Sequence, residues 1–318
     1  MNIIVAVDIG GTQIRAAAYE PDSITPIAQN KTRTLARVPG VFDRLVQTIE
    51  AVWQPGSVDA IGIASPGPLD PHTGTILDTP NIKEWVNFPV GPRLCETFGV
   101  PVFLDNDANM AGLAEWQYGA GRGHNDLVYL TVSTGIGGGV ISNGKLLQGF
   151  RGMAAELGHI TVDPNGPICG CGHPGHIESF ASGPAIARYV AEQLKAGKDS
   201  SLHMTPKPTA VQVAEAARDG DALAIEAFER AGYYLGIAVA NYLAIFDPSI
   251  LIFGGGASQA GDLLFLPFQK SLKKNIFHSH YLHDLIITKA ALGDDAGLLG
   301  ALALARLALE QDERQRSR

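Results

Sequence analysis

The sequence predicts an α/β protein built from two related halves. A buried strand, a glycine turn and a second strand occur around Gly10, Gly11 and Thr12, and the same pattern occurs again around residues 134–139. Helical patterns alternate with further apolar runs after each copy, as expected where helices cover a sheet. The length of 318 residues suits about two domains. Two unrelated glycine hairpins would give the same local pattern, so the repeat alone leaves that alternative open.

The first half is expected to follow the order βββαβα over residues 1–117. Runs rich in Ile and Val give the strands, and Gly10 and Gly11 turn the first strand into the second. Apolar residues at helical spacing, such as Val41, Leu45 and Ile49, give the helices. The expected strands are 2–8, 14–19, 24–32, 58–64 and 100–104, with helices at 41–52, after Pro89 and at 110–118.

The second half is expected to begin near Asp126. Asn143 and Gly144 are a strong signal for a two-residue hairpin. An irregular region rich in Gly, Pro, His and Cys follows at 151–178, and the polar tail 311–318 is expected to be disordered. The expected strands are 127–133, 140–142, 249–253 and 285–289, with a glycine turn at 134–139 and helices at 183–194, 209–218, 221–246, 262–275 and 296–309.

Composition and charge exclude several classes of protein. The chain has 24 Lys and Arg against 32 Asp and Glu, and its net charge of −8 argues against a broad nucleic-acid surface. Its three cysteines do not form a disulfide framework, which favours a reducing cytoplasm. The longest apolar helical stretch, 235–246, is shorter than the ~20 residues that span a bilayer. No signal peptide is expected, because the start of the chain lacks a basic segment.

Polar residues crowd the point where the strand at 100–104 ends and a helix begins. The residues Asp105, Asn106, Asp107 and Asn109 lie there. In open α/β sheets, ligands bind at the carboxyl ends of the strands. We expect Asp107 to be a catalytic base. The simpler interpretation is that Asp105 or Asn106 only caps the helix, and these residues alone favour the cap.

Three glycine-rich turns are candidates for binding phosphate or nucleotide. Asp8 precedes the first turn, and its carboxylate is the kind of ligand that Mg²⁺ prefers. The turn at 134–139 leads into a strand and not a helix, which argues against a dinucleotide-binding site. The sequence contains no G-x-x-x-x-G-K-[ST] motif, so a P-loop enzyme is not expected. The third turn, Gly254, Gly255 and Gly256, leaves room for a flat ring on bare backbone. A simple tight turn is the alternative in each case.

A cysteine and histidine cluster predicts a metal site. Cys169 and Cys171 lie two residues apart in a glycine-rich segment, with His159, His173 and His176 nearby. Four ligands from the protein are typical of a structural Zn²⁺ site, and two buried free thiols are the alternative. Glu156 and Glu178 add carboxylates that can accept hydrogen bonds from sugar hydroxyls, although surface charge would also account for them.

Taken together, these motifs resemble the ROK family of repressors, open reading frames and sugar kinases. The resemblance extends from Ile4 to the start of the last helix, and it rests on the segments 8–12, 66–68, 105–109, 134–139, 156–159 and 169–172. It implies two actin-like ATPase (ribonuclease H-like) domains with a cleft between them. The first would comprise residues 1–117 with about 297–318, and the second residues 118–296 with a zinc-binding loop at about 156–178. It also implies transfer of the ATP γ-phosphoryl group to a hexose hydroxyl.

The resemblance assigns expected roles to individual residues. Asp107 matches the base of the family. The sugar contacts would be Asn106, Asp107, Glu156, His159 and Glu178, with Gly67 and Asn81. The nucleotide side would be Asp8, Gly10, Gly11, Thr12, Thr134, Gly135, Gly254, Gly255 and Gly256. ATP and Mg²⁺ are the implied cofactors, together with a structural Zn²⁺.

The chain departs from the family pattern in the metal motif. The usual run C-x-C-G-x-x-G-C-x-E has His176 here in place of the third cysteine. Histidine is a competent zinc ligand, so Cys169, Cys171, His176 and His159 would form a Cys₂His₂ set. His159 would then bind metal through one ring nitrogen and present the other to the sugar.

Glucose is the expected acceptor, while N-acetylmannosamine, N-acetylglucosamine and fructose remain alternatives. A non-catalytic sugar sensor is an alternative of another class, which the base and the phosphate turns disfavour. No DNA-binding module is expected before Asp8. A homodimer or homotetramer is expected from the family.

Overall fold

The computed structural model describes residues 2–35, 40–79 and 82–316. Its first sheet has the strand order β3-β2-β1-β4-β7. The strands β1, β2 and β3 form an antiparallel meander, and β4 and β7 continue the sheet in parallel with β1. Their bounds are β1 Ile3–Ile9, β2 Gln13–Tyr19, β3 Ala28–Arg33, β4 Val58–Ser65 and β7 Val102–Asn106.

The second sheet repeats the topology of the first. Its order is β10-β9-β8-β11-β12, again with two antiparallel neighbours followed by two parallel ones. The two related halves that the glycine turns predict are therefore confirmed, and unrelated hairpins are not the explanation. The bounds are β8 Leu127–Val132, β9 Ile136–Ser142, β10 Lys145–Leu146, β11 Ile250–Gly254 and β12 Ile286–Lys289.

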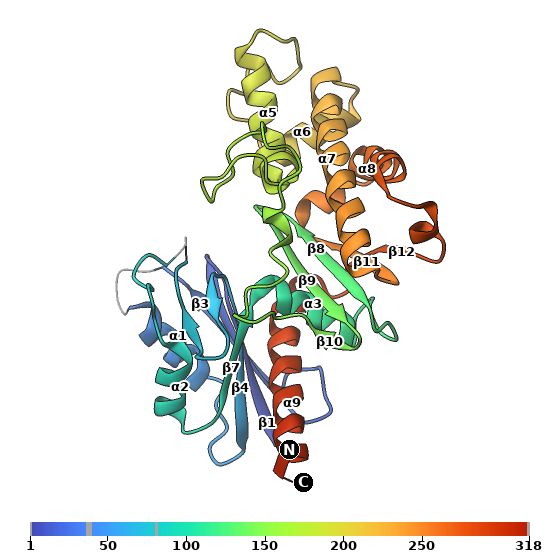
Figure 1. The fold of residues 1–318 in the computed structure, drawn as a ribbon. Helices are drawn as coiled ribbons and strands as arrows, with labels where there is room; N and C mark the ends of the chain where they lie inside the picture. The colour runs from blue at the N-terminus through green and yellow to red at the C-terminus, as the bar shows by residue number, and fades with distance from the viewer. Residues whose placement is uncertain (1, 36–39, 80–81, 317–318) are drawn as a thin grey trace.

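Helices cover both sheets and separate them (Figure 1). Helices α1 and α2 pack on the outer face of the first sheet, and α5, α6, α7 and α8 pack on the outer face of the second. Between the sheets, α9 packs on β1 and β4, while α3 packs on β8 and β9 and against α9. The main helices are α1 Val41–Glu50, α2 Val90–Phe98, α3 Asp107–Tyr118, α5 Gly183–Lys195, α6 Ala210–Arg218, α7 Ala222–Phe246, α8 Asp262–Asn275 and α9 Ala296–Arg316.

The short elements lie in the connections. A small two-stranded hairpin, β5 Leu69–Asp70 and β6 Thr75–Ile76, follows strand β4 of the first sheet. One-turn helices are η1 Leu157–His159, η2 Gly256–Ala260, η3 Ser279–Leu282, η4 Gly293–Asp295 and α4 Glu178–Ala181.

Side chains that alternate along the strands build three apolar cores. On β8, Leu127 and Tyr129 point into the core between the sheets, whereas Val128 and Leu130 point into the outer core under α7. This period of two is what strands buried on both faces require. Because α3 and α9 belong to the middle core, the two halves pack against each other there. The expected domain boundaries at 117 and 297 stay a prediction.

Glycines allow α9 to lie very close to its neighbours. A Cβ atom added at Gly62 of β4 would lie 1.9 Å from the Ala301 carbonyl oxygen of α9. A Cβ atom added at Gly300 of α9 would lie 2.0 Å from the Met110 carbonyl oxygen of α3. Both distances are far below van der Waals contact, so these two positions require glycine.

Two expectations from the sequence were wrong. Residues 311–316 are helical and not disordered, since α9 continues to Arg316 and an Arg314–Glu310 ion pair at 3.1 Å joins adjacent turns. The glycine turn at 134–139 is shorter than expected, because β9 already begins at Ile136 and pairs with Val132. Smaller differences are that β3 begins at Ala28 and that β7 extends to Asn106. Within the described residues, no helix has the length and apolar character needed to cross a membrane.

The contact at Gly300 generates a stability prediction. Gly300→Ala forces a methyl group against the α3 backbone, and overpacking of this kind costs about 1–3 kcal/mol of unfolding free energy. Gly40→Ala is the matched control, because φ there is −61° and the nearest atom to an added Cβ is 3.9 Å away. Chemical denaturation of both variants checks this. Equal denaturation midpoints for Gly300→Ala and Gly40→Ala would contradict the close contact between α9 and α3.

Candidate active site

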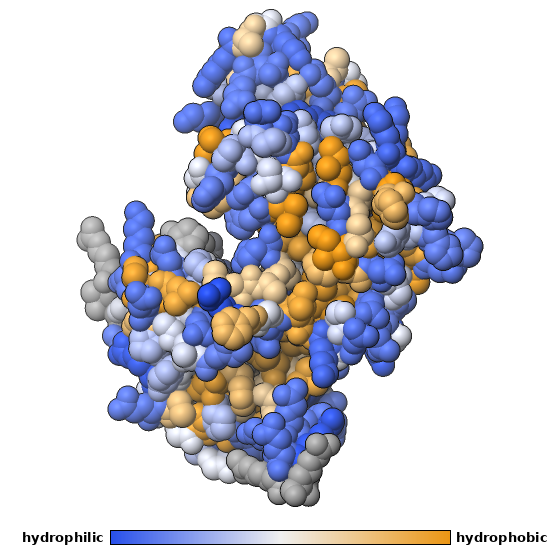
Figure 2. Space-filling model, viewed as in Figure 1, coloured by the Kyte–Doolittle hydropathy of each residue, from blue (hydrophilic) through white to orange (hydrophobic). Residues whose placement is uncertain are grey.

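A cleft of ≈1050 Å³ opens where the carboxyl ends of β1, β7 and β8 meet. On the face drawn in Figure 2, a hollow separates the two halves of the molecule. The cleft is lined from both halves, by Asp8, Asn106 and Asp107 on one side and by Thr134 and Glu156 on the other. The arrangement follows from the fold, since parallel strands bring their carboxyl ends to one edge.

The junction between β7 and α3 presents Asp107 to the cleft. Asn106 is the N-cap of α3, and its side-chain oxygen accepts a hydrogen bond from the Ala108 N–H at 2.9 Å. Asp107 is the first residue of the helix, and its Oδ1 accepts from the same N–H at 2.8 Å. The capping interpretation is therefore right for Asn106, and it leaves Asp107 free for another role.

The surroundings of Asp107 favour a carboxyl group that holds its proton unusually well. Burial of the carboxyl between the cleft walls raises its pKa to about 6, while the Ala108 N–H lowers it and the carboxylates of Asp8 and Glu156 raise it further. The side chain lines the cleft and is open to water that enters it. A carboxylate with this pKa can accept a proton near neutral pH.

Asp8 is held by an ion pair across the first hairpin. The Gly10 N–H donates to the Gln13 carbonyl at 2.8 Å, and this turn sets Asp8 directly opposite Arg15. Arg15 Nη2 lies 2.5 Å from Asp8 Oδ2 and also donates to the Asp294 carbonyl. The sequence analysis did not identify Arg15. The hairpin register was the signal for it, because a turn over residues 10–13 places 8 and 15 side by side.

The second turn is joined to Glu178. Its Oε2 accepts a hydrogen bond from the Ile136 N–H at 3.0 Å, and a Cβ atom added at Gly135 would lie 2.6 Å from the same oxygen. Thr134, Gly135 and Glu178 all line the cleft.

The other glycines of this run serve close packing. Gly137 and Gly139 lie in β9, where an added Cβ would approach the Ala108 Cβ at 2.7 Å and the Ala108 carbonyl at 2.9 Å. They let the first turn of α3 lie directly on the second sheet. The run therefore combines a turn at the cleft with a helix contact.

The third glycine turn is also required by close contacts within the protein. A Cβ atom at Gly254 would lie 2.3 Å from the Tyr129 hydroxyl oxygen, and one at Gly255 would lie 2.5 Å from the Val132 carbonyl. Gly255 also has φ of +82°. All three glycines, with Tyr129, line the cleft. Tyr129 was missed because its position in β8 is like that of any other buried strand residue.

Most of the residues expected to bind sugar or nucleotide line the cleft, whereas Gly67 and His159 do not. Gly67 lies behind Asn106, where an added Cβ would be 3.2 Å from the Asn106 amide nitrogen. His159 follows Glu156 in the same turn, and its N–H donates to the Glu156 carbonyl at 3.1 Å. Asn81 lies outside the described residues. The residues brought together on the wall are Asp8, Gly10, Gly11, Thr12, Asn106, Asp107, Thr134, Gly135, Glu156, Glu178, Gly254, Gly255 and Gly256.

A second groove, of ≈1240 Å³, adjoins the cleft between α5 and α6. The two share Ser133, Thr134, Gly256 and Gln259. The groove is mainly apolar, and Arg188, Lys195, Lys207 and Arg218 line it with no carboxylate among the described lining residues. An apolar groove joined to glycine turns, with cations on its wall, suits a flat base attached to phosphates.

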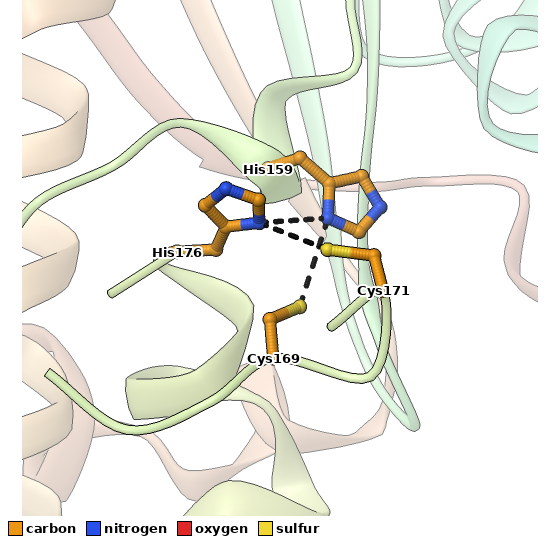
Figure 3. A group of neighbouring side chains, drawn as sticks. All are labelled: His159, Cys169, Cys171 and His176. Atoms are coloured by element: carbon orange, nitrogen blue, oxygen red, sulfur yellow. Dashed lines mark hydrogen bonds between the residues drawn. The ribbon is translucent and has the colours of Figure 1, made fainter. Parts of the chain in front are cut away.

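The four expected metal ligands meet in one cluster (Figure 3). His159 Nδ1 and His176 Nδ1 lie 3.3 Å apart. Cys169 Sγ lies 3.7 Å from the first nitrogen, and Cys171 Sγ lies 3.2 Å from the second. Ligands held about 2.0–2.3 Å from a tetrahedral Zn²⁺ lie roughly 3.3–3.8 Å from one another, so the donor set fits this ion. The second ring nitrogen of each histidine points away from the cluster.

The cluster is tied to the cleft through Glu178. Cys169 Sγ lies 3.3 Å from Glu178 Oε1, while Oε2 of the same carboxylate accepts from the Ile136 N–H. The loop folds through two glycines with positive φ, Gly172 and Gly175. At Gly175 an added Cβ would lie 1.7 Å from the Asp163 carbonyl, so the loop cannot close around a larger residue there.

Comparison with known proteins identifies relatives over nearly the whole chain. The model of the ROK family matches residues 4–308. The glucokinase of Thermotoga maritima is 39% identical over 95% of this chain and 96% of its own length. The crystal structure of a ROK family glucokinase from Streptomyces griseus, in complex with glucose and AMPPNP, has 34% identity and a TM-score of 0.77, and covers 96% of this chain and 99% of that one. The ROK hexokinase from Thermus thermophilus has 34% identity and a TM-score of 0.82, with 97% and 99% covered.

Proposed function

The chain belongs to the ROK family, and we propose that it transfers the γ-phosphoryl group of ATP to a hydroxyl group of glucose. The observation that carries the proposal is that Asp107, Asp8 and the glycine turns all line the same cleft. The proposal is supported by relatives of nearly equal length that are glucokinases, one of them solved with glucose and a nucleotide analogue. The reaction would make glucose 6-phosphate.

Asp107 is the proposed catalytic base. Phosphoryl transfer needs little covalent chemistry from the protein, so positioning and charge stabilisation supply most of the rate. Asp107 accepts the proton of the attacking sugar hydroxyl as that oxygen bonds to the γ-phosphorus, while the bond between the γ-phosphorus and the oxygen that bridges it to the β-phosphate breaks and ADP leaves. Its pKa of about 6 leaves it ionised at neutral pH and still basic enough to take the proton.

The nucleotide is proposed to span the cleft and the adjoining groove. The phosphates would lie against Gly10, Gly11 and Thr12 on one side and Thr134 and Gly135 on the other. The base would lie beside Gly254, Gly255 and Gly256, in the apolar groove between α5 and α6.

The Asp8 carboxylate fits a hard divalent ion. It would hold the Mg²⁺ that accompanies ATP, and the bound ion neutralises charge on the phosphates. Arg15 keeps Asp8 oriented toward the cleft before the nucleotide binds.

The sugar is proposed to lie between the end of β7 and the loop before α4. Asn106, Glu156 and Glu178 would contact its hydroxyls there, together with His159. Gly67 would act by keeping Asn106 in place, and Asn81 remains a prediction. N-acetylmannosamine, N-acetylglucosamine and fructose stay alternative acceptors, because their hydroxyls match the same donors and acceptors. A sugar sensor is disfavoured, since binding alone has no use for a base with a raised pKa.

Cys169, Cys171, His159 and His176 are proposed to hold a structural Zn²⁺. The bound ion would keep the loop closed, and the loop would lie directly behind the sugar, because Cys169 contacts Glu178, one of the proposed sugar contacts. A homodimer or homotetramer and a cytoplasmic location stay predictions.

The first test is ADP release with Mg-ATP and a panel of glucose, mannose, fructose, N-acetylglucosamine and N-acetylmannosamine. We expect turnover with glucose, and a loss of about 10²–10⁴-fold in kcat for Asp107→Asn. Asp43→Asn, on the exposed face of α1, is the control and keeps full activity. The melting temperature of Asp107→Asn does not fall, because the substitution removes a charge that is costly to bury. Normal turnover by Asp107→Asn would remove this residue from the role of base, and no turnover with any sugar would favour the sensor.

The raised pKa of Asp107 predicts the pH profile. The ionised carboxylate is the active form, so kcat/KM for glucose is constant well above pH 6 and falls about tenfold per unit below it. Initial rates from pH 5 to 8 check this, with samples returned to pH 7.5 to exclude unfolding. A profile that stays flat down to pH 5 would show that no group with this pKa is needed.

Metal content tests the cluster. Protein purified without chelator should carry about one zinc per chain by mass spectrometry, as a four-ligand structural site requires. His176→Cys keeps the metal because thiolate also binds zinc, whereas His176→Ala and Cys169→Ser lose it and melt at a lower temperature. Cys95→Ser is the control, because Cys95 is an exposed free cysteine outside the cluster. Zinc-free protein with an unchanged melting temperature would contradict the site.

A further inference from the structure

A strap of irregular chain, residues 147–156, joins the two halves beside the cleft. It leaves the second sheet after β10 and passes close to β7 (Figure 1). At Gly152 an added Cβ would lie 2.1 Å from the Pro71 ring, so the strap rests on the first half there. It then returns and ends at Glu156 on the cleft wall. The strap therefore contacts the first half and also contributes to the cleft wall.

Gln148 makes the strap's hydrogen bond to the first half. Its Nε2 donates to Asp105 Oδ2 at 2.6 Å. The strap holds Gln148 in turn, since the Ala154 N–H donates to the Gln148 carbonyl at 3.0 Å and the Leu147 N–H donates to β9. The two partners lie 43 residues apart in the chain, and one belongs to β7 of the first half and the other to the strap of the second half.

Asp105 is fully buried, and neutral donors surround it. Its Oδ1 accepts from the Asn106 N–H at 2.7 Å and from the Asn109 amide at 3.0 Å, and its Oδ2 accepts from Gln148. A buried carboxylate is costly unless its oxygens are hydrogen-bonded. The Gln148 amide is therefore a large part of what keeps Asp105 in its present position.

Asp105 in turn determines the position of the proposed base. It precedes Asn106 and Asp107, and through Asn109 it connects the end of β7 to the first turn of α3. A rotation of Asp105 would carry the Asn106 cap with it and redirect Asp107. Misplacement of a reacting group by about 1 Å can lower a rate by roughly 10²-fold.

We infer that Gln148 is a positioning residue, which fixes the β7–α3 junction from the second half of the molecule and so sets where Asp107 lies relative to Glu156. The inference rests on the proposed kinase activity. Gln148 does not line the cleft itself, so it acts through Asp105 and touches neither substrate.

The hydrogen bond can be broken and restored by paired substitutions. Gln148→Glu sets one carboxylate against another, and Gln148→Met keeps the length of the side chain but removes the donor. In the double variant Asp105→Asn with Gln148→Glu, the amide oxygen introduced at position 105 can still accept from Asn106 and Asn109. The amide nitrogen introduced there takes the place of Oδ2 and donates to the new carboxylate. The pair then keeps one negative charge and one hydrogen bond, with the roles of donor and acceptor exchanged.

We expect Gln148→Glu to lower kcat about 10²-fold with little change in KM for ATP, and Gln148→Met to lower it less. The double variant should recover most of kcat, which independent effects could not produce. Gln29→Glu, on the exposed face of β3, is the matched control and leaves kcat unchanged. Melting temperatures and active-site titration correct each rate for the folded fraction.

Three outcomes overturn the inference. They are a normal kcat per folded molecule in Gln148→Glu, a rise in KM alone, or a double variant that is folded but no more active than Gln148→Glu. If the wild-type chain phosphorylates no sugar, the proposed function has failed. The link between Gln148 and Asp105 is then judged from the melting temperatures of the wild type, Gln148→Glu, Gln148→Met and the double variant. A melting temperature that recovers in the double variant supports the bond, and a melting temperature that does not recover overturns it.

Discussion

Close contact of the first turns of α3 with β9 and with α9 is the constraint on which the site depends. Gly137 and Gly139 of β9 lie against Ala108, and Gly300 of α9 lies against Met110. With both neighbours at backbone distance, the helix cannot slide or tilt without a clash. Asp107 stands at the start of this helix, so the packing of three backbones holds the carboxylate at the meeting point of the two sheets.

Much of the fold could be predicted because its signals are local. The first hairpin and the repeated order of strands follow from apolar runs and glycine pairs. The Asp105–Gln148 bond and the Tyr129–Gly254 contact join segments far apart in the chain, and no local pattern encodes them. The run 134–139 misled for a related reason. A glycine that is needed because a helix packs too close for a side chain cannot be told, from the sequence, from a glycine that forms a turn.

The charges of the cleft are arranged so that its carboxylates do not all act alike. Asp8 is paired with Arg15, whereas Asp107 faces Asp8 and Glu156 without a cation of its own among the described ion pairs. Burial and these neighbours raise the pKa of Asp107, and burial also raises the pKa of Glu156. The environment therefore separates a carboxylate suited to a metal ion from one suited to a proton.

The irregular region after β10 keeps a definite shape because side chains from regular elements anchor it at intervals. Asp105 of β7 holds Gln148, the Tyr242 hydroxyl of α7 donates to the Leu157 carbonyl, and the Tyr234 hydroxyl donates to Asp163 at 3.2 Å. The cysteine and histidine cluster closes the last part of the segment. Each anchor lies close in sequence to one turn of the segment that carries Glu156 and Glu178. An irregular segment anchored in this way can differ in shape between related proteins while the two sheets stay the same, and it is where we expect the choice of sugar to be made.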